Sequence, residues 1–347
     1  MDEPAAVVRL RRVGRRFAPV AVVLLVLAAL LRVAGVEAVL ASLAELRARD
    51  AAVLVVAGVL PLVFWGLELR LVLAGMDVPV GTARAVGLFV ASGFLNNVTP
   101  FGEVGGDPPS GLLIAGVCRV PFERGLAAIA SVNAVNRVAV LALGAAGVAW
   151  LGPDVGRIGV GWALVEVFAV WAVLFGVLLA AWVYREAIVA TAGPPLAAAV
   201  VRVGRRLPFV AAPTEAAVEE RIGGFVAAIE RLAAEPRRLL VALLLGGAGH
   251  LAVAATLWLS LGALGVRTPI ADLLVVIPLA KLSGLSPTPG GAGSAEVLLA
   301  GLLVGVAGVP TATAAAAALV YRAAAFWVPT AIGGVATAWF VGRIAVE

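Results

Sequence analysis

The chain has 347 residues, 62% of them hydrophobic, and a mean hydropathy of +1.07, so an ordinary soluble domain is excluded. Its net charge of +5 comes from 25 arginines and one lysine against 21 acidic residues. The arginines lie mainly between apolar runs, which favours membrane topology over nucleic-acid binding. Cys118 and His250 are the only residues of their kinds, which excludes an internal disulfide and argues against a metal site or a Ser-His-Asp triad.

Apolar runs of about 20 residues, the length that crosses a bilayer core, recur along the chain. We predict that the first run is a retained span rather than a signal peptide, because the basic N-terminus is followed by no convincing small-residue cleavage site. The predicted full-length spans are roughly 17–35, 51–74, 125–151, 160–183, 237–263 and 312–342.

Four shorter apolar pieces are too short to span alone, and they flank two Gly- and Pro-rich segments, 96–109 and 286–296. Broken backbone is tolerated at membrane depth only where it is buried in protein or lines a cavity. We therefore predict two re-entrant helical hairpins with these segments at their tips. Asp107 is expected to cap the second helix of the first hairpin, with Pro108 at its first position, and Ser294 to cap a helix that begins near Ala295. The shorter pieces are 85–98, 109–118, 272–286 and 294–308.

The fold class expected is an all-α polytopic membrane protein, with about six full spans plus two re-entrant helical hairpins in an inverted repeat. Arginine clusters at the N-terminus and in 184–238 place the N- and C-termini in the cytoplasm of a plasma-membrane protein. The hairpins then enter from opposite sides, an arrangement typical of alternating-access carriers. Residues 1–347 form one transmembrane domain, in which 85–151 and 272–342 are the repeats and 184–236 is a cytoplasmic amphipathic connector.

Three cations lie within apolar surroundings and are candidates for substrate binding. Lys281, the only lysine, lies six residues before Pro287, while Arg137 and Arg322 lie in the long spans after the two hairpins. Guanidinium groups match phosphate bidentately, so a carrier of a phosphorylated lipid would need them at a cavity. The alternatives are snorkelling or neutralisation of Glu296 for Lys281, and for the arginines a structural ion pair with an acidic residue of the hairpins.

The hairpin tips supply further candidates. Their carboxylates could hold a cation, take up a proton or lock a gate, although capping explains Asp107 and the helix dipole favours Glu296. Asn96 and Asn97 could bind substrate or cap the preceding helix. The prolines and glycines allow turns that could bind an anion, but their spacing fits no nucleotide motif. The acidic candidates are Glu103, Asp107 and Glu296; the backbone candidates are Pro100, Gly102, Gly105, Gly106, Pro287, Pro289, Gly290, Gly291 and Gly293.

Three further polar residues lie in or near predicted spans. Glu68 and Arg70 lie near the end of the second span, where snorkelling to the interface explains Arg70. His250, inside the fifth span, is expected to make a polar packing contact rather than to act as a proton relay.

The two tips, NNVTPFGEVGG at 96–106 and PTPGGAGSAE at 287–296, resemble those of the flippase-like integral membrane family typified by the transmembrane region of lysylphosphatidylglycerol synthase. Tyr321-Arg322 is similar to the family's pattern too, which adds Tyr321 to the substrate-binding candidates. The chain departs from that pattern at Asn136, where an acidic residue often precedes the arginine, so a carboxylate of the cavity is expected to be missing.

The resemblance implies translocation of a charged-headgroup lipid, or a lipid-linked precursor, between leaflets. The lipid would be anionic, aminoacylated or of the polyprenyl-phosphate type. The alternative is a non-catalytic membrane subunit that presents lipid to a separate synthase or glycosyltransferase. We expect no enzymatic activity, because no nucleophile–base pair is evident, and no cofactor, metal or nucleic acid; a homo-oligomer is left open.

Overall fold

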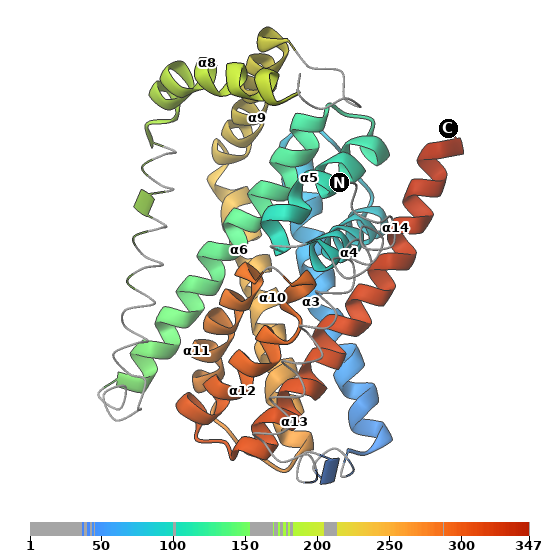
Figure 1. The fold of residues 1–347 in the computed structure, drawn as a ribbon, viewed down its shortest axis with the longest axis vertical. Coiled ribbons are helices and arrows are strands. Elements are labelled where there is room, and N and C mark those ends of the chain that lie inside the picture. Colours follow the sequence, from blue (N-terminus) through green and yellow to red (C-terminus); the bar gives the residue numbers. More distant parts are fainter. Residues whose placement is uncertain are drawn as a thin grey trace, which may run out of the picture.

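The chain forms only helices in the part that the structure, a computed structural model, describes (Figure 1). That part comprises residues 46–99, 102–152, 183–204, 214–286 and 288–346, with a few isolated positions at 37–44 and 169–180. The first half contains α3 (Ala48–Gly75), α4 (Thr82–Val98), α5 (Gly102–Cys118), α6 (Phe122–Leu151), α8 (Arg185–Gly204) and α9 (Glu215–Ala233). The second half contains α10 (Pro236–Ala263), α11 (Ile270–Ala280), η2 (Lys281–Leu285), η3 (Pro289–Gly291), α12 (Ser294–Ala307), α13 (Thr311–Arg322), η4 (Ala323–Trp327) and α14 (Val328–Val346).

Several helical segments are long and apolar enough to cross a membrane, so the chain is a multi-pass membrane protein. Four of them coincide with predicted spans: α3, α6, α10 and the continuous run from α13 to α14. The fifth, Pro289–Ala307, covers a piece that the sequence predicts as short, because the 3₁₀ turn η3 extends the helical run to 19 residues. The predicted spans 17–35 and 160–183 lie outside the continuously described segments.

Small residues let these helices approach one another closely, as is usual in membrane bundles. Five consecutive alanines of α13, residues 314–318, are fully buried in one core cluster. In α3, Gly58 lies against the backbone of Ala324, and a Cβ added there would collide with it. Helix contact therefore depends on missing side-chain volume as much as on large apolar side chains.

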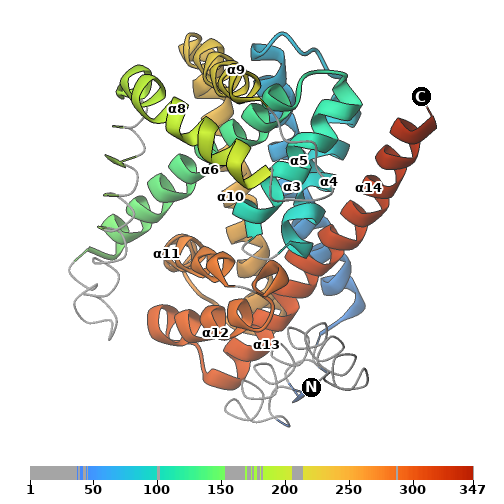
Figure 2. The same cartoon turned by 45° about the horizontal axis from the view of Figure 1, so that its top comes forward.

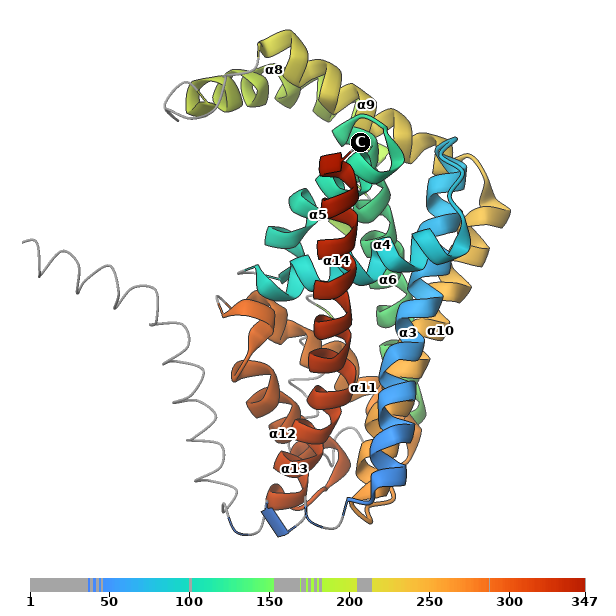
Figure 3. The same cartoon turned by 90° about the vertical axis from the view of Figure 1, so that its right-hand side faces the viewer.

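The helices on either side of the two breaks pack in a reciprocal way. α4 packs along α14 and α11 packs along α6, so the first helix of each predicted hairpin contacts the long helix of the other half. Figure 3 shows α4 crossing α14, with α3 and α10 side by side along the bundle. The two halves are thus interleaved rather than stacked as separate units.

The segment 184–236 forms two helices at one end of the bundle, the end at which the C-terminus also lies (Figures 1 and 2). α9 places Phe225 and Ile229 against the core cluster formed by α3 to α6, and it contacts α6 and α10. α8 packs on α9, and Arg185 Nε donates to Glu230 Oε1 at 2.6 Å. The amphipathic pattern of α9 is thus satisfied by the bundle itself.

Candidate functional site

A cavity of about 370 Å³ lies where the two interrupted regions meet. α3, α4, α6, α11, η2 and the α13–α14 run all contribute to its wall. Its polar and charged lining residues are Ser92, Asn96, Asn97, Asn133, Asn136, Arg137, Lys281, Ser283 and Arg322, and apolar side chains such as Leu62, Phe89 and Ile129 complete it. Three cations and no carboxylate therefore stand among the described residues that line this space.

Glycines allow the two tips to meet at this cavity. Gly102 (φ +53°) lies against the second tip, where an added Cβ would be 3.2 Å from the carbonyl oxygen of Gly284. Gly290 (φ +58°) lies against the first, where a Cβ would collide with the Phe326 ring and lie 3.1 Å from the carbonyl oxygen of Asn97. Both positions have a left-handed backbone that favours glycine; a Cβ would collide with its neighbours at Gly290 and make a tight contact at Gly102.

A buried ion pair joins the second tip to the helix after it. Arg322 Nε donates to Glu296 Oε1 at 2.9 Å, and the side chains are only 10% and 3% exposed. The second carboxylate oxygen of Glu296 accepts from the N–H of Gly293 at 2.7 Å, while Arg322 Nη2 donates to the carbonyl of Gly290 at 3.0 Å. Of the alternatives for Arg322, the ion pair with Glu296 is therefore the one present in this conformation.

The start of α12 differs in detail from the prediction. The helix begins at Ser294, and its N-cap is Gly293 rather than Ser294. Glu296 accepts the N–H of Gly293, while Ser294 Oγ donates backwards to the carbonyl of Gly291 at 2.9 Å. Gly293 holds this place because its φ of +84° is open to glycine but strained for other residues.

A π-helical turn, η4, follows Arg322 directly and carries Phe326, whose ring lies under the guanidinium at 3.7 Å from Arg322 Cζ to the ring centroid. Pro329 has no N–H for the helix ladder, which favours an irregular turn here. Thr330 Oγ1 donates to the carbonyl of Phe326 at 2.6 Å. The irregular turn and the cation–π contact together fix the direction of Arg322.

Lys281 is placed differently from the prediction of a cation within an apolar helix. It is the C-cap of α11 and begins the 3₁₀ turn η2, so the second break starts at Lys281 rather than Ser286. Its side chain is exposed and its Nζ lies 5.8 Å from the centroid of the Trp65 ring. Lys281 and Arg322 line both this cavity and an adjoining one of about 210 Å³, which Tyr321 also lines.

The first tip is shorter than predicted, because α5 already begins at Gly102. The prediction that Asp107 is an N-cap is wrong, since Asp107 and Pro108 lie inside α5. Instead, Asn133 Nδ2 of α6 donates to Asp107 Oδ1 at 2.8 Å. The hydrogen-bond donor to Asp107 is thus a side chain of a neighbouring helix rather than a backbone N–H of α5.

The asparagines near the first tip do not cap α4. Thr99 does so, through its Oγ1, which donates to the carbonyl of Leu95 at 2.6 Å. Asn97 Nδ2 instead crosses to α14 and donates to Thr330 Oγ1 at 2.7 Å. Asn96 lines the cavity, and its buried Oδ1 has no hydrogen-bond partner among the described residues.

A second buried carboxylate, Glu68 of α3, was named in the sequence analysis but not among the candidate site residues. Its side chain is 0% exposed, and Asn136 Nδ2 donates to its Oε2 at 2.9 Å. Its other oxygen, Oε1, has no hydrogen-bond partner in the described part of the chain. A signal was present: Glu68 is the only acidic residue of the apolar run 51–74, and carboxylates in such runs need a partner.

His250 of α10 completes this cluster. Its Nε2 lies 3.1 Å from the carbonyl oxygen of Asn136 and therefore donates to it, and Trp65 lies edge-on at 5.2 Å between ring centroids. The expected polar packing contact is thus present. Asn136, which stands where an acidic residue was expected before Arg137, is hydrogen-bonded to the carboxylate of Glu68 from α3.

The structure brings most of the predicted residues together. Asn96, Asn97, Arg137, Lys281, Gly290 and Arg322 line one cavity, Tyr321 lines the next, and Glu296 reaches the first through Arg322. Gly106 packs on Asn96, Gly291 packs on Ser283, and Pro289 begins η3. Pro100 and Pro287 lie outside the described residues, as do the side-chain surroundings of Glu103 and Gly105.

Comparison with known proteins agrees with this architecture. A "UPF0104 membrane protein" of Methanothermobacter thermautotrophicus is 44% identical over 89 residues, which are 25% of this chain and 26% of that protein, so the match spans about a quarter of the relative. Residues 16–333 match the family described as "Lysylphosphatidylglycerol synthase TM region", a range that includes both tips and the residues that line the cavity. With nearly its whole length matched, the chain belongs to the lysylphosphatidylglycerol synthase TM region family.

Proposed function

We propose that the protein translocates a lipid with an anionic headgroup, or a lipid-linked precursor, between membrane leaflets. The observation that carries the proposal is the central cavity, whose described lining has three cations, Arg137, Lys281 and Arg322, and no carboxylate. Charge inside a membrane bundle is costly, on the order of 2.5–3.5 kcal/mol per residue on insertion scales, and so marks a functional pathway by default. Arg322 is already paired with Glu296, and a phosphate that entered here could accept charge-assisted hydrogen bonds from the guanidinium groups of the lining.

The mixed lining supports an amphipathic substrate rather than a free anion. Asn96, Asn97 and Asn133 offer amide groups beside the cations, while Leu62 and Leu141 present apolar surface to the same space. A polar headgroup would lie against the amides and guanidinium groups, and its acyl chains would stay near the apolar wall. A site for inorganic phosphate has no use for that apolar surface.

The packing of the two halves supports a carrier. The reciprocal contacts, α4 on α14 and α11 on α6, are those expected of an inverted repeat in which α4–α5 and α11–α12 form re-entrant hairpins. Broken helices that meet at mid-bundle are the usual construction of an alternating-access site. In this proposal the headgroup passes between the two tips, and opening one side requires the Arg322–Glu296 pair to rearrange.

Arginine distribution supports a plasma-membrane protein whose α8–α9 end faces the cytoplasm, together with both chain termini. The cytoplasmic side in this proposal carries Arg185, Arg202, Arg231, Arg237 and Arg238 of the described residues. The opposite end holds fewer: Arg267 in the short loop after α10, and Arg47 and Arg49 at the start of α3.

A second candidate function is favoured by the family description itself, since the matched region is named as part of a synthase. In this alternative the chain is a non-catalytic subunit that presents lipid to a separate synthase or glycosyltransferase. The same cavity would then hold the lipid without moving it across. In both cases the proposal assigns no enzymatic step to this chain.

The test is leaflet exchange of fluorescent lipids in liposomes that contain the purified protein, followed by quenching from outside. Anionic, aminoacylated and polyprenyl-phosphate lipids are compared with a zwitterionic one. Arg137→Gln removes a lining cation, and loss of a charged hydrogen bond to phosphate is worth roughly a tenfold to hundredfold decrease in exchange. Arg202→Gln, an exposed position of α8 away from the cavity, is the charge-matched control and should exchange normally.

The outcomes separate the two functions. Selective exchange that falls in Arg137→Gln but not in the control supports translocation. Binding of lipid without exchange favours the presenting subunit, which is then tested by co-purification with a lipid-modifying enzyme. Exchange that is equal in Arg137→Gln, or insensitive to headgroup charge, would exclude this cavity as the route.

A further inference from the structure

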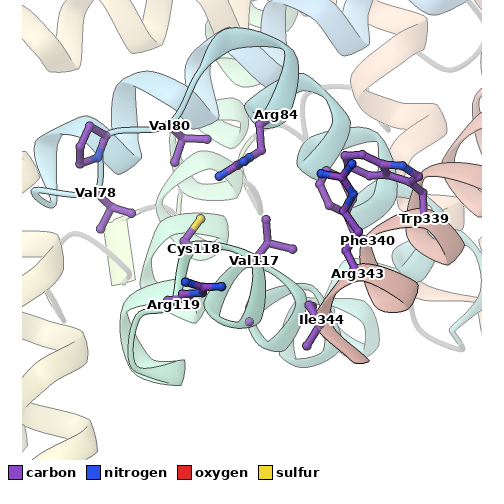
Figure 4. Close-up of a pocket in the computed structure, with 12 residues that line it drawn as sticks. Val78, Val80, Arg84, Val117, Cys118, Arg119, Trp339, Phe340, Arg343 and Ile344 are labelled. Atoms are coloured by element: carbon purple, nitrogen blue, oxygen red, sulfur yellow. The ribbon is translucent and has the colours of Figure 1, made fainter. Parts of the chain in front are cut away.

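A second polar pocket, of about 350 Å³, lies away from the central cavity, between the α3–α4 loop, the α5–α6 turn and the last turns of α14. Figure 4 shows Arg84, Arg119 and Arg343 around it, with Cys118 between Arg84 and Arg119. The three arginines come from three separate elements, and no carboxylate is among the residues that line it. Its volume falls within the range of small-molecule sites, about 300–1,000 Å³.

The depth of this pocket is indicated by Trp339. The Trp339 ring is exposed on α14, and Arg343 Cζ lies 4.3 Å from its centroid. Exposed tryptophans at the end of a spanning helix mark the headgroup region, where they form the aromatic belt. Val335, one helical turn earlier, is 73% exposed and apolar, as expected of a residue that faces acyl chains. The pocket thus lies at the depth of lipid phosphates.

We propose that this pocket binds the phosphate of an anionic phospholipid, with Arg84, Arg119 and Arg343 around the headgroup and the acyl chains along the exposed apolar face of α14. Guanidinium groups bind phosphate through bidentate, charge-assisted hydrogen bonds, which lysines do not reproduce. The site is separate from the cavity and includes none of its residues. It goes beyond the proposed translocation and does not depend on it.

The consequence for the protein is a fixed lipid at the end of α14. Arg343 is in the last turn of α14, and Arg84 is in the first turn of α4, the helix that packs along α14. A phosphate between them joins the two helices whose other ends form the first tip and the π-helical turn. The bound lipid therefore stabilises the α4–α14 contact.

The test counts bound lipids by native mass spectrometry of the detergent-purified protein, with phosphatidylglycerol titrated against phosphatidylcholine. In Arg84→Gln/Arg343→Gln, phosphatidylglycerol binding is expected to fall roughly 30-fold, at about 1 kcal/mol per basic residue near an anionic lipid. Arg202→Gln/Arg231→Gln removes the same charge from exposed positions of α8 and α9 and should bind as the unmodified protein does. Equal phosphatidylglycerol binding in the two double variants would overturn the proposal.

The only cysteine of the chain gives a second measurement on the unmodified protein. Cys118 lines the pocket, so an occupied pocket should slow its reaction with a maleimide several-fold. Vesicles of phosphatidylglycerol are compared with phosphatidylcholine vesicles and with phosphatidylcholine plus inorganic phosphate. Protection by phosphatidylglycerol alone identifies a lipid headgroup; protection by inorganic phosphate as well identifies a site for the free anion and overturns the lipid assignment. Equal reaction rates of Cys118 in all three vesicle preparations contradict the site. If Cys118 does not react at all, phosphatidylglycerol binding that is unchanged in Arg84→Gln/Arg343→Gln contradicts it.

Discussion

The two buried carboxylates around the central cavity, Glu296 on one side and Glu68 on the other, differ in how completely they are satisfied. Glu296 uses both oxygens, one for Arg322 and one for the N–H of Gly293. Glu68 uses one oxygen, for Asn136, and its other oxygen has no hydrogen-bond partner in the described residues. Both side chains are almost completely buried, so burial alone does not distinguish them.

The difference is one of chemistry as well as geometry. Glu296 faces a guanidinium that matches its charge and a helix N-terminus that favours it. Glu68 faces a neutral amide, and the nearby His250 donates to a backbone carbonyl rather than to the carboxylate. The Glu296 pair therefore holds the second tip in place, whereas the Glu68 cluster retains unused hydrogen-bonding capacity beside the cavity.

The largest expected effect comes from breaking the satisfied pair. Arg322→Ala leaves Glu296 buried without its cation, and removal of one partner of a buried ion pair costs roughly 3–5 kcal/mol. We expect a large fall in the detergent unfolding temperature and in yield. Measured exchange should then be normalised to folded protein, since a loss of fold would otherwise be read as a loss of transport.

The double variant Arg322→Met/Glu296→Met separates pairing from packing. If the pair is structural, removing both charges should recover much of the stability lost in either single variant, because no uncompensated charge remains. A double variant as unstable as the sum of the two singles would mean that the residues do not act as a pair. Lost exchange in a stable double variant would instead assign the pair to transport.

The next effect applies one substitution to both carboxylates. Glu296→Gln should lower the unfolding temperature, because the buried Arg322 loses its counter-charge. Glu68→Gln should leave it unchanged or raise it, because an amide keeps the acceptor for Asn136 and removes a buried negative charge that faces only a neutral amide. Thermal unfolding of both variants in one detergent measures the contrast. If Glu68→Gln is destabilised, the charge of Glu68 is compensated in the fold, and the proposed difference between Glu68 and Glu296 is wrong.

Much of the cavity was predictable, because charge in an apolar run has few ways to be accommodated. Arg322 and Glu296 both lie within apolar stretches of one half, so their pairing was among the expected outcomes. Asp107 was predicted to be an N-cap because a proline follows it, a pattern that considers one helix only. The structure shows a tertiary contact with Asn133 in place of the cap. Local patterns describe one helix at a time, and here the decisive partner came from another.

Glu68 shows the same limit from the opposite direction. Its partner Asn136 is 68 positions away on a different helix, and nothing in the run 51–74 indicates which side of α3 meets α6. The resemblance marked Asn136 as a missing carboxylate, but only the packing of the two helices shows that a carboxylate of α3 lies beside it. Contacts between residues on different helices are thus the part of the site that the hydrophobic pattern of the sequence cannot predict.

The smallest effect tests the neutral contact between the two halves. Asn97 Nδ2 of α4 donates to Thr330 Oγ1 of α14, the same helix pair that the proposed lipid site joins at its other end. Thr330→Val keeps the shape and removes the hydroxyl, so the loss should be about 1 kcal/mol, typical of one hydrogen bond and far below that of Arg322→Ala. Thr337→Val is the matched control, because the closer acceptor of the Thr337 hydroxyl is the carbonyl of Gly333 in its own helix, at 2.8 Å, with the carbonyl of Ala91 on α4 at 3.3 Å. If Thr330→Val changes stability as little as Thr337→Val yet accelerates exchange, the Asn97–Thr330 bond restrains the first tip rather than stabilising the fold. If both variants change stability and exchange equally, the Asn97–Thr330 bond has no special role, and only the ionic contacts would hold the tips together.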